Sequence, residues 1–308
     1  MRKSITATIT IILVVFFISG CAAVGGNGQG GAINLEDGLG RAVSLPQPAQ
    51  RIVSLSPSVT EILFAVGAGE QVIGRDSFSN YPAEAQAIQD VGGSMGNYSI
   101  ETIASLEPDL VIAAEINTPE QVKALEDLGL NVYYLSNPTE LAGIFDLLST
   151  VGVLSGHQEE AEQLNTSLRE RVQTVEETIA RADSRPLVFY ELDGTDPAKP
   201  WTPGPGSFMD ELIRAAGGEN AAAGLTSAWA QISIEELLVQ DPDIILLGDS
   251  IWGLTPEQVA ARPGWDGLNA VSQGRVLPFN DDLVSRPGPR LVDGLEELAR
   301  LIHPELYP

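Results

Sequence analysis

The side chains in this sequence best suited to holding a ligand are aromatic residues in loop-like segments. Trp201 lies in a Pro- and Gly-rich segment, residues 197–206, and Trp229 follows a run of small residues, 221–228. Core packing explains an aromatic ring in a loop less well than one in a strand, and a flat apolar ligand would gain a large contact area from such rings. We therefore expect Trp201 and Trp229 to contact a ligand, with loop anchoring as the alternative.

Three further residues are candidates for the same site. Phe78 could contact the ligand or pack down its own loop. Asp282 could accept hydrogen bonds from ligand amides, and Arg286 could bind an anionic group through two parallel hydrogen bonds. The alternatives are a solvated turn for Asp282 and a surface ion pair for Arg286. The other two tryptophans, Trp252 and Trp265, are expected to be structural.

Catalytic and metal-binding chemistry has little support. The chain has one cysteine, Cys21, and two histidines, His157 and His303, which lie far apart. Such a set favours neither a metal site nor a nucleophile paired with histidine. The patterns HExxH and CxxC are absent, and residues 204–207 lack the P-loop pattern, so we interpret them as a turn. We predict no catalytic residue, metal site or resident cofactor, and a secreted hydrolase with paired carboxylates is a remote alternative.

The charge of the chain excludes one class of partner. Its 17 basic and 42 acidic residues give a net charge of −25, which repels phosphate backbones, so we expect no nucleic acid partner. The length of 308 residues suits two lobes, and the 44% of apolar residues can form a sizeable core.

The elements that must position the candidate residues come in two similar halves. The shared unit is a Ser-Ile-Glu triplet, then an acidic-Pro-Asp turn and an apolar run, found at Ser99, Glu101 and 107–112, and again at Ser233, Glu235 and 241–246. The serine can cap a helix, and the glutamate sits in the first turn, where the helix dipole favours it. Proline stops the helix, and the apolar run is typical of a buried parallel strand.

Further strands and helices occur at corresponding places in the two halves and predict the fold. Strands are expected at 52–55, 132–135, 187–190 and 276–279, with helices at 59–66 and 208–216. Between the halves, residues 158–182 carry apolar side chains at helical spacing without Pro or Gly, which predicts a rod of roughly 38 Å. The fold class is therefore α/β, with two Rossmann-like parallel-sheet lobes joined by one long backbone helix. We expect lobes over 35–155 and 186–308, the backbone helix over 156–185, and a ligand cleft between the lobes.

The N-terminus predicts export. Arg2 and Lys3 precede an apolar run at 9–18 and then small residues before Cys21, so residues 1–20 are interpreted as a signal peptide. The ending resembles the bacterial lipobox, which implies cleavage before Cys21 and lipidation of its sulfur; a secretory signal with an incidental cysteine is the alternative. Gly-rich residues 21–34 predict a flexible tether. We expect an extracytoplasmic protein anchored to the membrane by lipid.

Five segments in combination match one known family. They are RIVSLSPSVTE at 51–61, residues 76–82, VGG at 91–93, LEPDLV at 106–111 and AGGEN at 216–220. Together they resemble the solute-binding proteins of ABC importers for cobalamin, ferric siderophores and haem, the periplasmic binding proteins with a helical backbone. The resemblance runs from about residue 51 to the C-terminus. It implies two lobes joined by a helix, a shallow cleft that binds a small metal chelate, and docking onto a membrane permease; we expect a monomer.

Within this family the chain is most similar to the cobalamin binders, in which aromatic side chains of both lobes cradle the corrinoid. The resemblance places ligand-binding roles on Phe78, Trp201, Trp229, Asp282 and Arg286. In two places the chain departs from the pattern, because Ser94 and Met95 occupy the region of a first-lobe tryptophan and Ala114 replaces another. A ferric siderophore or haem therefore remains an alternative to a corrinoid as the ligand.

Glu101 and Glu235 occupy equivalent places in the two halves. The resemblance implies that both dock on arginines of the permease. A first-turn acid interacting with the helix dipole, worth about 0.3–1 kcal/mol, would explain each residue alone but not the repetition.

Overall fold

Two four-stranded parallel sheets organise the chain, one in each half of the computed structural model, which describes residues 31–93 and 96–307. The first contains β4 (Val72–Arg75), β3 (Ile52–Ser54), β5 (Leu110–Ala114) and β6 (Val132–Leu135), in that spatial order. The second contains β9 (Glu219–Asn220), β7 (Leu187–Glu191), β11 (Ile244–Leu247) and β12 (Val276–Pro278). In both sheets the strand that comes first in the chain lies between the second and the third. The two matching parallel sheets confirm the predicted fold class.

Helices cover both faces of each sheet because successive strand residues point to opposite sides. In the N-lobe, one face packs on α1 (Pro57–Ala65) and α4 (Gly143–Ser155), and the other on α2 (Ile100–Ser105) and α3 (Pro119–Glu126). In the C-lobe, α6 (Phe208–Ala215) and α10 (Leu291–Ile302) lie opposite α7 (Ile234–Gln240), α8 (Pro256–Ala260) and α9 (Asn269–Ser272). Short 3-10 helices complete the lobes: η1 (Gly69–Gln71), η2 (Ala83–Ala87), η4 (Gly248–Trp252), η5 (Trp265–Gly267), η6 (Asp281–Leu283) and η7 (Pro304–Leu306).

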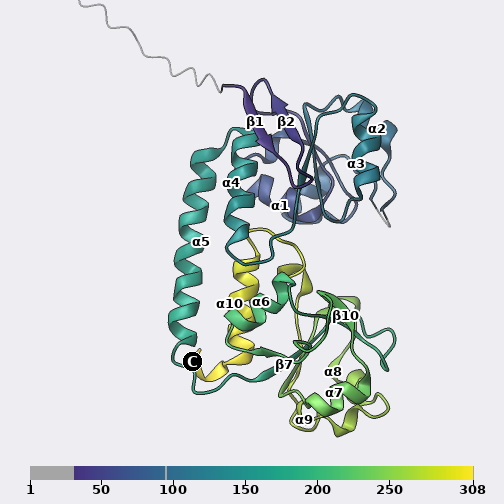
Figure 1. The fold of residues 1–308 in the computed structure, drawn as a ribbon, viewed down its shortest axis with the longest axis vertical. Helices are drawn as coiled ribbons and strands as arrows, with labels where there is room; N and C mark the ends of the chain where they lie inside the picture. The colour runs from purple at the N-terminus through teal and green to yellow at the C-terminus, as the bar shows by residue number, and fades with distance from the viewer. Residues whose placement is uncertain (1–30, 94–95, 308) are drawn as a thin grey trace, which may run out of the picture.

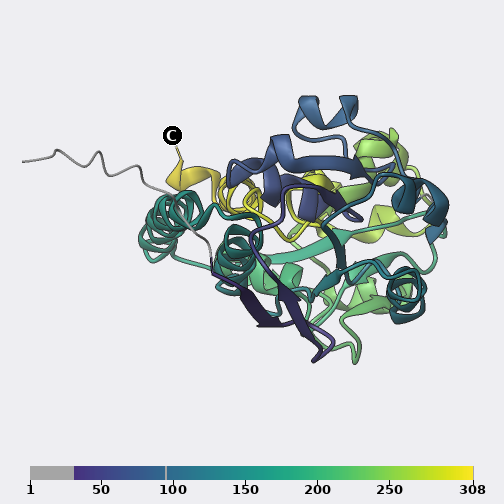
Figure 2. The same ribbon diagram turned by 90° about the horizontal axis from the view of Figure 1, so that it is seen from above.

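A single long helix, α5 (Gln158–Ile179), connects the lobes. Figure 1 shows it running along one side of the molecule beside α4 of the N-lobe and α10 of the C-lobe, and both contacts are made. Seen from above, the teal helices α4 and α5 stand at one edge of the molecule (Figure 2). Arg171 of α5 also binds Asp293 and Glu296 of α10 at 2.6 and 2.8 Å. The helix ends before residue 182, so it is slightly shorter than its apolar spacing predicted.

The geometry of the two halves follows the sequence repeat closely. Ser99 and Ser233 cap α2 and α7 by accepting hydrogen bonds from the backbone N–H groups of Thr102 and Glu236. Of the described residues other than glycine, only Glu107 and Asp241 have positive φ, and both have φ of 47°. The same tight turn therefore leads into β5 and into β11, which makes these strands structural counterparts.

Two antiparallel ribbons differ from the sequence predictions. β1 (Ile33–Glu36) pairs with β2 (Ala42–Leu45), because Ile33 and Leu45 face one another and are both buried. The predicted tether, which ran to residue 34, therefore ends earlier. β8 (Trp201–Pro203) pairs with β10 (Trp229–Gln231), so the two segments predicted as loops form a ribbon.

Several sequence predictions lie outside the described residues: the signal peptide, Cys21, most of the tether, and the departure at Ser94 and Met95. None of the helices formed by residues 31–93 and 96–307 is long and apolar enough to cross a membrane.

Candidate ligand-binding site

A cavity of about 630 Å³ lies where loops of the two lobes meet. Its walls come from the loops that follow six strands, β3, β4, β5 and β6 of the N-lobe and β11 and β12 of the C-lobe. The carboxyl ends of parallel strands are where open α/β sheets place their ligands. The sixteen lining residues are Ser56, Pro57, Ser58, Ser77, Phe78, Asn80, Ala114, Ile116, Asn137, Ile251, Trp252, Asp281, Asp282, Ser285, Arg286 and Pro287.

Phe78 reaches the cavity on a loop held by a buried acid. Asp76 follows β4, and one of its carboxyl oxygens accepts hydrogen bonds from the backbone N–H groups of Phe78 and Ser79 at 3.0 and 2.8 Å. Burial raises the pKa of Asp76 to about 6. The Phe78 ring is 45% exposed, so the loop presents it to the cavity and does not pack it away.

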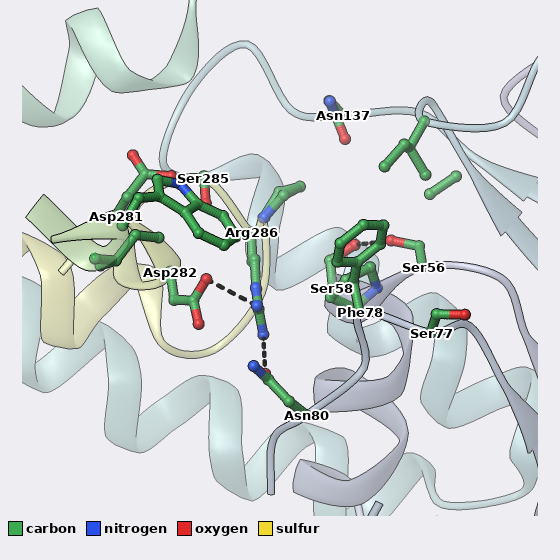
Figure 3. Close-up of a pocket in the computed structure, with 16 residues that line it drawn as sticks. Ser56, Ser58, Ser77, Phe78, Asn80, Asn137, Asp281, Asp282, Ser285 and Arg286 are labelled. Atoms are coloured by element: carbon green, nitrogen blue, oxygen red, sulfur yellow. Dashed lines mark hydrogen bonds and ion pairs between the residues drawn. The ribbon is translucent and has the colours of Figure 1, made fainter. Parts of the chain in front are cut away.

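The C-lobe supplies the charged groups. The hydroxyl of Tyr190 donates to Asp281 Oδ1 at 2.8 Å, and burial raises the pKa of Asp281. Asp282 forms an ion pair with Arg286 at 2.7 Å. Figure 3 shows Arg286 in the middle of the site, with Asp282 on one side and Phe78 on the other. The structure thus brings together three of the five residues predicted to bind the ligand.

The guanidinium of Arg286 is also part of a buried network that crosses between the lobes. Its Nη1 donates to Glu61 of α1 at 3.0 Å and to Asn80 at 2.8 Å. The same carboxylate accepts hydrogen bonds from Arg290 Nε and Nη2 at 2.7 and 2.6 Å, and Arg290 lies over the ring of Tyr81. The Glu61 side chain is only 1% exposed. Sequence reasoning did not find Glu61, because its partners lie 225 and 229 residues away in the chain.

Trp252 corrects a sequence prediction. It was expected to be structural, but it lines the cavity and is 79% exposed. Ile251 beside it and Ile116 of the N-lobe line the same cavity and are also exposed. Trp265, by contrast, is fully buried, and its indole Nε1 donates to the carbonyl of Pro197 at 3.1 Å, as expected of a structural residue.

Trp201 and Trp229 are not among the residues that line this cavity. They lie on the β8–β10 ribbon, and each is 43% exposed. The ring of Trp229 packs edge-on against Phe208 at 5.9 Å between centroids, so part of its surface is used to hold the ribbon on α6. Contact of these two rings with a ligand stays a prediction.

A second hollow of about 460 Å³ adjoins the cavity, since Trp252 lines both. At its base Arg262 binds both carboxyl oxygens of Glu191 at 2.6 and 2.9 Å. Glu191 is fully buried, and this burial raises its pKa to about 7 in spite of the arginine. The pair connects the end of β7 with the loop after α8 and supports this part of the C-lobe.

Glu101 and Glu235 are exposed in the first turns of α2 and α7, one on each lobe. Both helices cover the sheet face opposite to the one that packs toward α5 (Figure 1). The first turns that carry the two glutamates therefore lie on the side of the molecule away from the backbone helix. Elsewhere in the described part of the chain, no cluster of three or more His, Cys, Asp or Glu side chains could hold a metal ion.

Comparison with known proteins agrees with this architecture. A substrate-binding lipoprotein of an ABC transporter from Bacillus subtilis, YvrC, is 33% identical, with 89% of this chain and 87% of that protein covered. The crystal structure of the vitamin B12 binding protein BtuF of Vibrio cholerae has a TM-score of 0.72 at 29% identity, covering 83% of this chain and 97% of that one. The haem-binding protein RhuT from Roseiflexus, in its apo form, has a TM-score of 0.75 at 28% identity, covering 84% and 99%.

The sequence matches the periplasmic binding protein family over residues 52–283, a range that begins at β3 and ends in η6. The match therefore includes both sheets, the connecting helix and most of the residues that line the cavity; Ser285, Arg286 and Pro287 lie just beyond it. This chain belongs to the periplasmic binding protein family.

Proposed function

We propose that this protein is the extracytoplasmic substrate-binding lipoprotein of an ABC importer, which captures cobalamin or a related corrinoid between its lobes and delivers it to the permease. The chemistry of the cavity wall carries the choice of ligand. The wall combines an apolar surface with hydroxyl, amide and carboxylate groups. Among the described residues that line it, Arg286 is the single cation, and it already has three protein partners.

A corrinoid offers groups that complement this wall. Its macrocycle has broad faces that gain contact area from apolar and aromatic side chains. Its peripheral carboxamides can donate hydrogen bonds to the carboxylates of Asp281 and Asp282 and exchange them with Asn137 and the serines. Asp282 and Arg286 thus act as a polar pair in which Arg286 positions the acid and Asp282 accepts from the ligand.

A ferric siderophore or haem is the second candidate, favoured by the structural similarity to haem-binding RhuT. Haem would bring two propionates and would favour an axial histidine or tyrosine. The described residues that line the cavity include no histidine or tyrosine. They include two aspartates and one arginine, and that arginine is already paired within the protein. These features favour a ligand that is neutral or positively charged.

The partner in this proposal is the permease, which Glu101 and Glu235 contact, one from each lobe. Their exposure on the same side of the molecule supports this role, because arginines on one membrane protein could then reach both. The anchor in the proposal is a lipid on Cys21. Capture requires no covalent step, so the ligand leaves the protein unchanged and the protein is not an enzyme.

Calorimetric titration with cyanocobalamin, haemin and ferrioxamine B tests the ligand. We expect saturable 1:1 binding of cyanocobalamin and recovery of the unchanged ligand by mass spectrometry. Binding of haemin or ferrioxamine B with no response to cyanocobalamin would refute the corrinoid and support the second candidate.

Transport assays in cells that contain the cognate permease test the partner. We expect Glu101→Arg combined with Glu235→Arg to abolish uptake and to leave the affinity for the ligand unchanged. Glu236→Arg, which changes the neighbouring exposed glutamate of α7, is the matched control. Equal uptake by the double variant and wild type would refute the docking role. For the anchor, Cys21→Ser should move the protein from the membrane fraction to the soluble fraction.

A further inference from the structure

Four of the eleven large apolar side chains that are exposed in the described residues line the cavity. Trp252 is 79% exposed, Ile116 60% and Ile251 42%, and all three line the cavity with Phe78. Trp252 is also the most exposed of the four tryptophans. Exposed apolar groups gathered in one place mark a binding surface more often than chance exposure does.

The turn that carries Trp252 is fixed at its base and free at its tip. It follows β11 as η4 and ends at Gly253, whose φ of 94° suits glycine. At the base, Asp249 accepts a hydrogen bond from the N–H of Gly194 at 2.9 Å, and the Ser250 hydroxyl donates to the carbonyl of Phe279 at 3.0 Å. Ile251 and Trp252 are thereby held out from the C-lobe.

The N-lobe has a counterpart of this turn. Ile116 follows β5, the strand that the repeat equates with β11. The buried side chain of Asn117 accepts a hydrogen bond from the N–H of Ala114 at 2.9 Å and holds the turn in place. Ala114 itself lines the cavity with a single methyl group, so it leaves the N-lobe wall without a bulky ring at this position. The widest apolar side chain in the cavity therefore comes from the C-lobe.

We infer that Trp252 is a specificity-determining residue, whose indole stacks on a ring face of the ligand and which, with Ile251, forms a C-lobe jaw opposite Ile116 and Phe78. The inference rests on the proposed function, since it names the residues that hold the corrinoid macrocycle. Within this cavity Trp252 is then the main aromatic contact, while contact of Trp201 and Trp229 with a ligand stays a separate prediction. A ligand without a broad unsaturated or apolar face would gain little from this jaw.

Titrations of Trp252→Ala and Trp252→Phe with cyanocobalamin test the inference. We expect Trp252→Ala to raise the Kd by about 10- to 100-fold, the factor that corresponds to exposing one large apolar side chain again. Trp252→Phe should retain most of the affinity because it keeps an aromatic face. Val239→Ala, which truncates a side chain of α7 that is 78% exposed and outside the cavity, is the control and should leave the Kd unchanged.

Fluorescence gives a second readout that a structural role would not change. In wild type, the ligand should protect the most accessible tryptophan from acrylamide quenching, and Trp252→Phe should lose this protected component. If Trp252→Ala binds cyanocobalamin with wild-type affinity, the inference is overturned and the proposed function stays in place. If that variant also loses transport, Trp252 belongs to the permease interface instead.

Failure of the corrinoid proposal would have a different signature. If wild type binds only haemin or ferrioxamine B, the same variants are titrated with that ligand, and an unchanged Kd for Trp252→Ala overturns the inference there. If wild type binds none of the three, both the ligand assignment and the jaw are refuted.

Discussion

Glu61→Gln tests whether a buried carboxylate holds the two lobes together next to the cavity. Glu61 belongs to the N-lobe, and its partners Arg286 and Arg290 belong to the C-lobe. The side chains are 1%, 11% and 12% exposed, so solvent screens this interaction little. The substitution keeps the size of the side chain and removes its charge. It also turns one carboxylate oxygen into an NH2 group, which cannot accept the hydrogen bonds that the guanidinium groups donate.

The expected loss of stability depends on the interactions that each arginine retains in the variant. Removing one partner of a buried ion pair costs about 3–5 kcal/mol. Arg286 retains Asp282 at 2.7 Å and Asn80 at 2.8 Å, and Arg290 retains the Tyr81 ring at 4.1 Å from its guanidinium carbon. We therefore expect the lower end of the range, about 3 kcal/mol. At roughly 2–4 °C per kcal/mol for a chain of this size, the Tm should fall by about 6–12 °C.

Differential scanning calorimetry of wild type and Glu61→Gln measures this shift. Glu126→Gln is the matched control, since Glu126 pairs with Arg41 at 2.6 Å but is 42% exposed and lies within one lobe. An exposed pair of this kind contributes about 0.2–1 kcal/mol, so the control should shift the Tm by no more than a few degrees. Equal shifts in the two variants would show that the Glu61 network does not hold the lobes together.

Three smaller predictions follow from other groups. Because burial raises the pKa of Asp76 from 3.8 to about 6, its stabilising contribution is present below about pH 3.8 and is lost as the pH rises through 6. Urea unfolding should show wild type losing up to about 3 kcal/mol relative to Asp76→Asn between pH 4 and 7, and parallel pH profiles would contradict this. Trp265→Ala should lower the free energy of unfolding by about 3–5 kcal/mol, because the ring is fully buried; urea midpoints equal to wild type would exclude that role. Arg171→Gln should cost no more than about 1 kcal/mol by the same measurement, because its partners on α10 are 24% and 43% exposed, and a larger loss would mean that the pair braces α5.

The repeat made the fold predictable, and the local chemistry of the unit explains why. A serine cap, a first-turn glutamate and a proline-containing turn are short-range signals, and each was found where the sequence placed it. The positive φ values at Glu107 and Asp241 are the structural form of that turn. Once two such units are recognised, parallel sheets and a connecting helix follow from chain geometry.

The site was only partly predictable because its contacts are long-range. Phe78, Asp282 and Arg286 were assigned through the family resemblance, and they meet in one cavity. Glu61 sits in α1, which the sequence predicted as a helix, but nothing local identifies its partners in the other lobe. Trp252 was misjudged because the sequence does not reveal that a 3-10 turn after β11 ends in the cavity.

The Glu61 network and α5 together bear on how capture and release must work in the proposed function. Two separate connections brace the lobes: a 22-residue helix at one edge of the molecule, and a buried carboxylate next to the cavity. Because both connections fix the angle between the lobes, little of the binding free energy is used to close the cavity around the ligand. The jaw of Trp252 and Ile251 can therefore act as a preorganised binding surface. Release then requires a force that separates the lobes and breaks the Glu61 contacts. Docking through Glu101 on one lobe and Glu235 on the other would let the permease bind each lobe separately and pull the lobes apart. A single docking point could not do this.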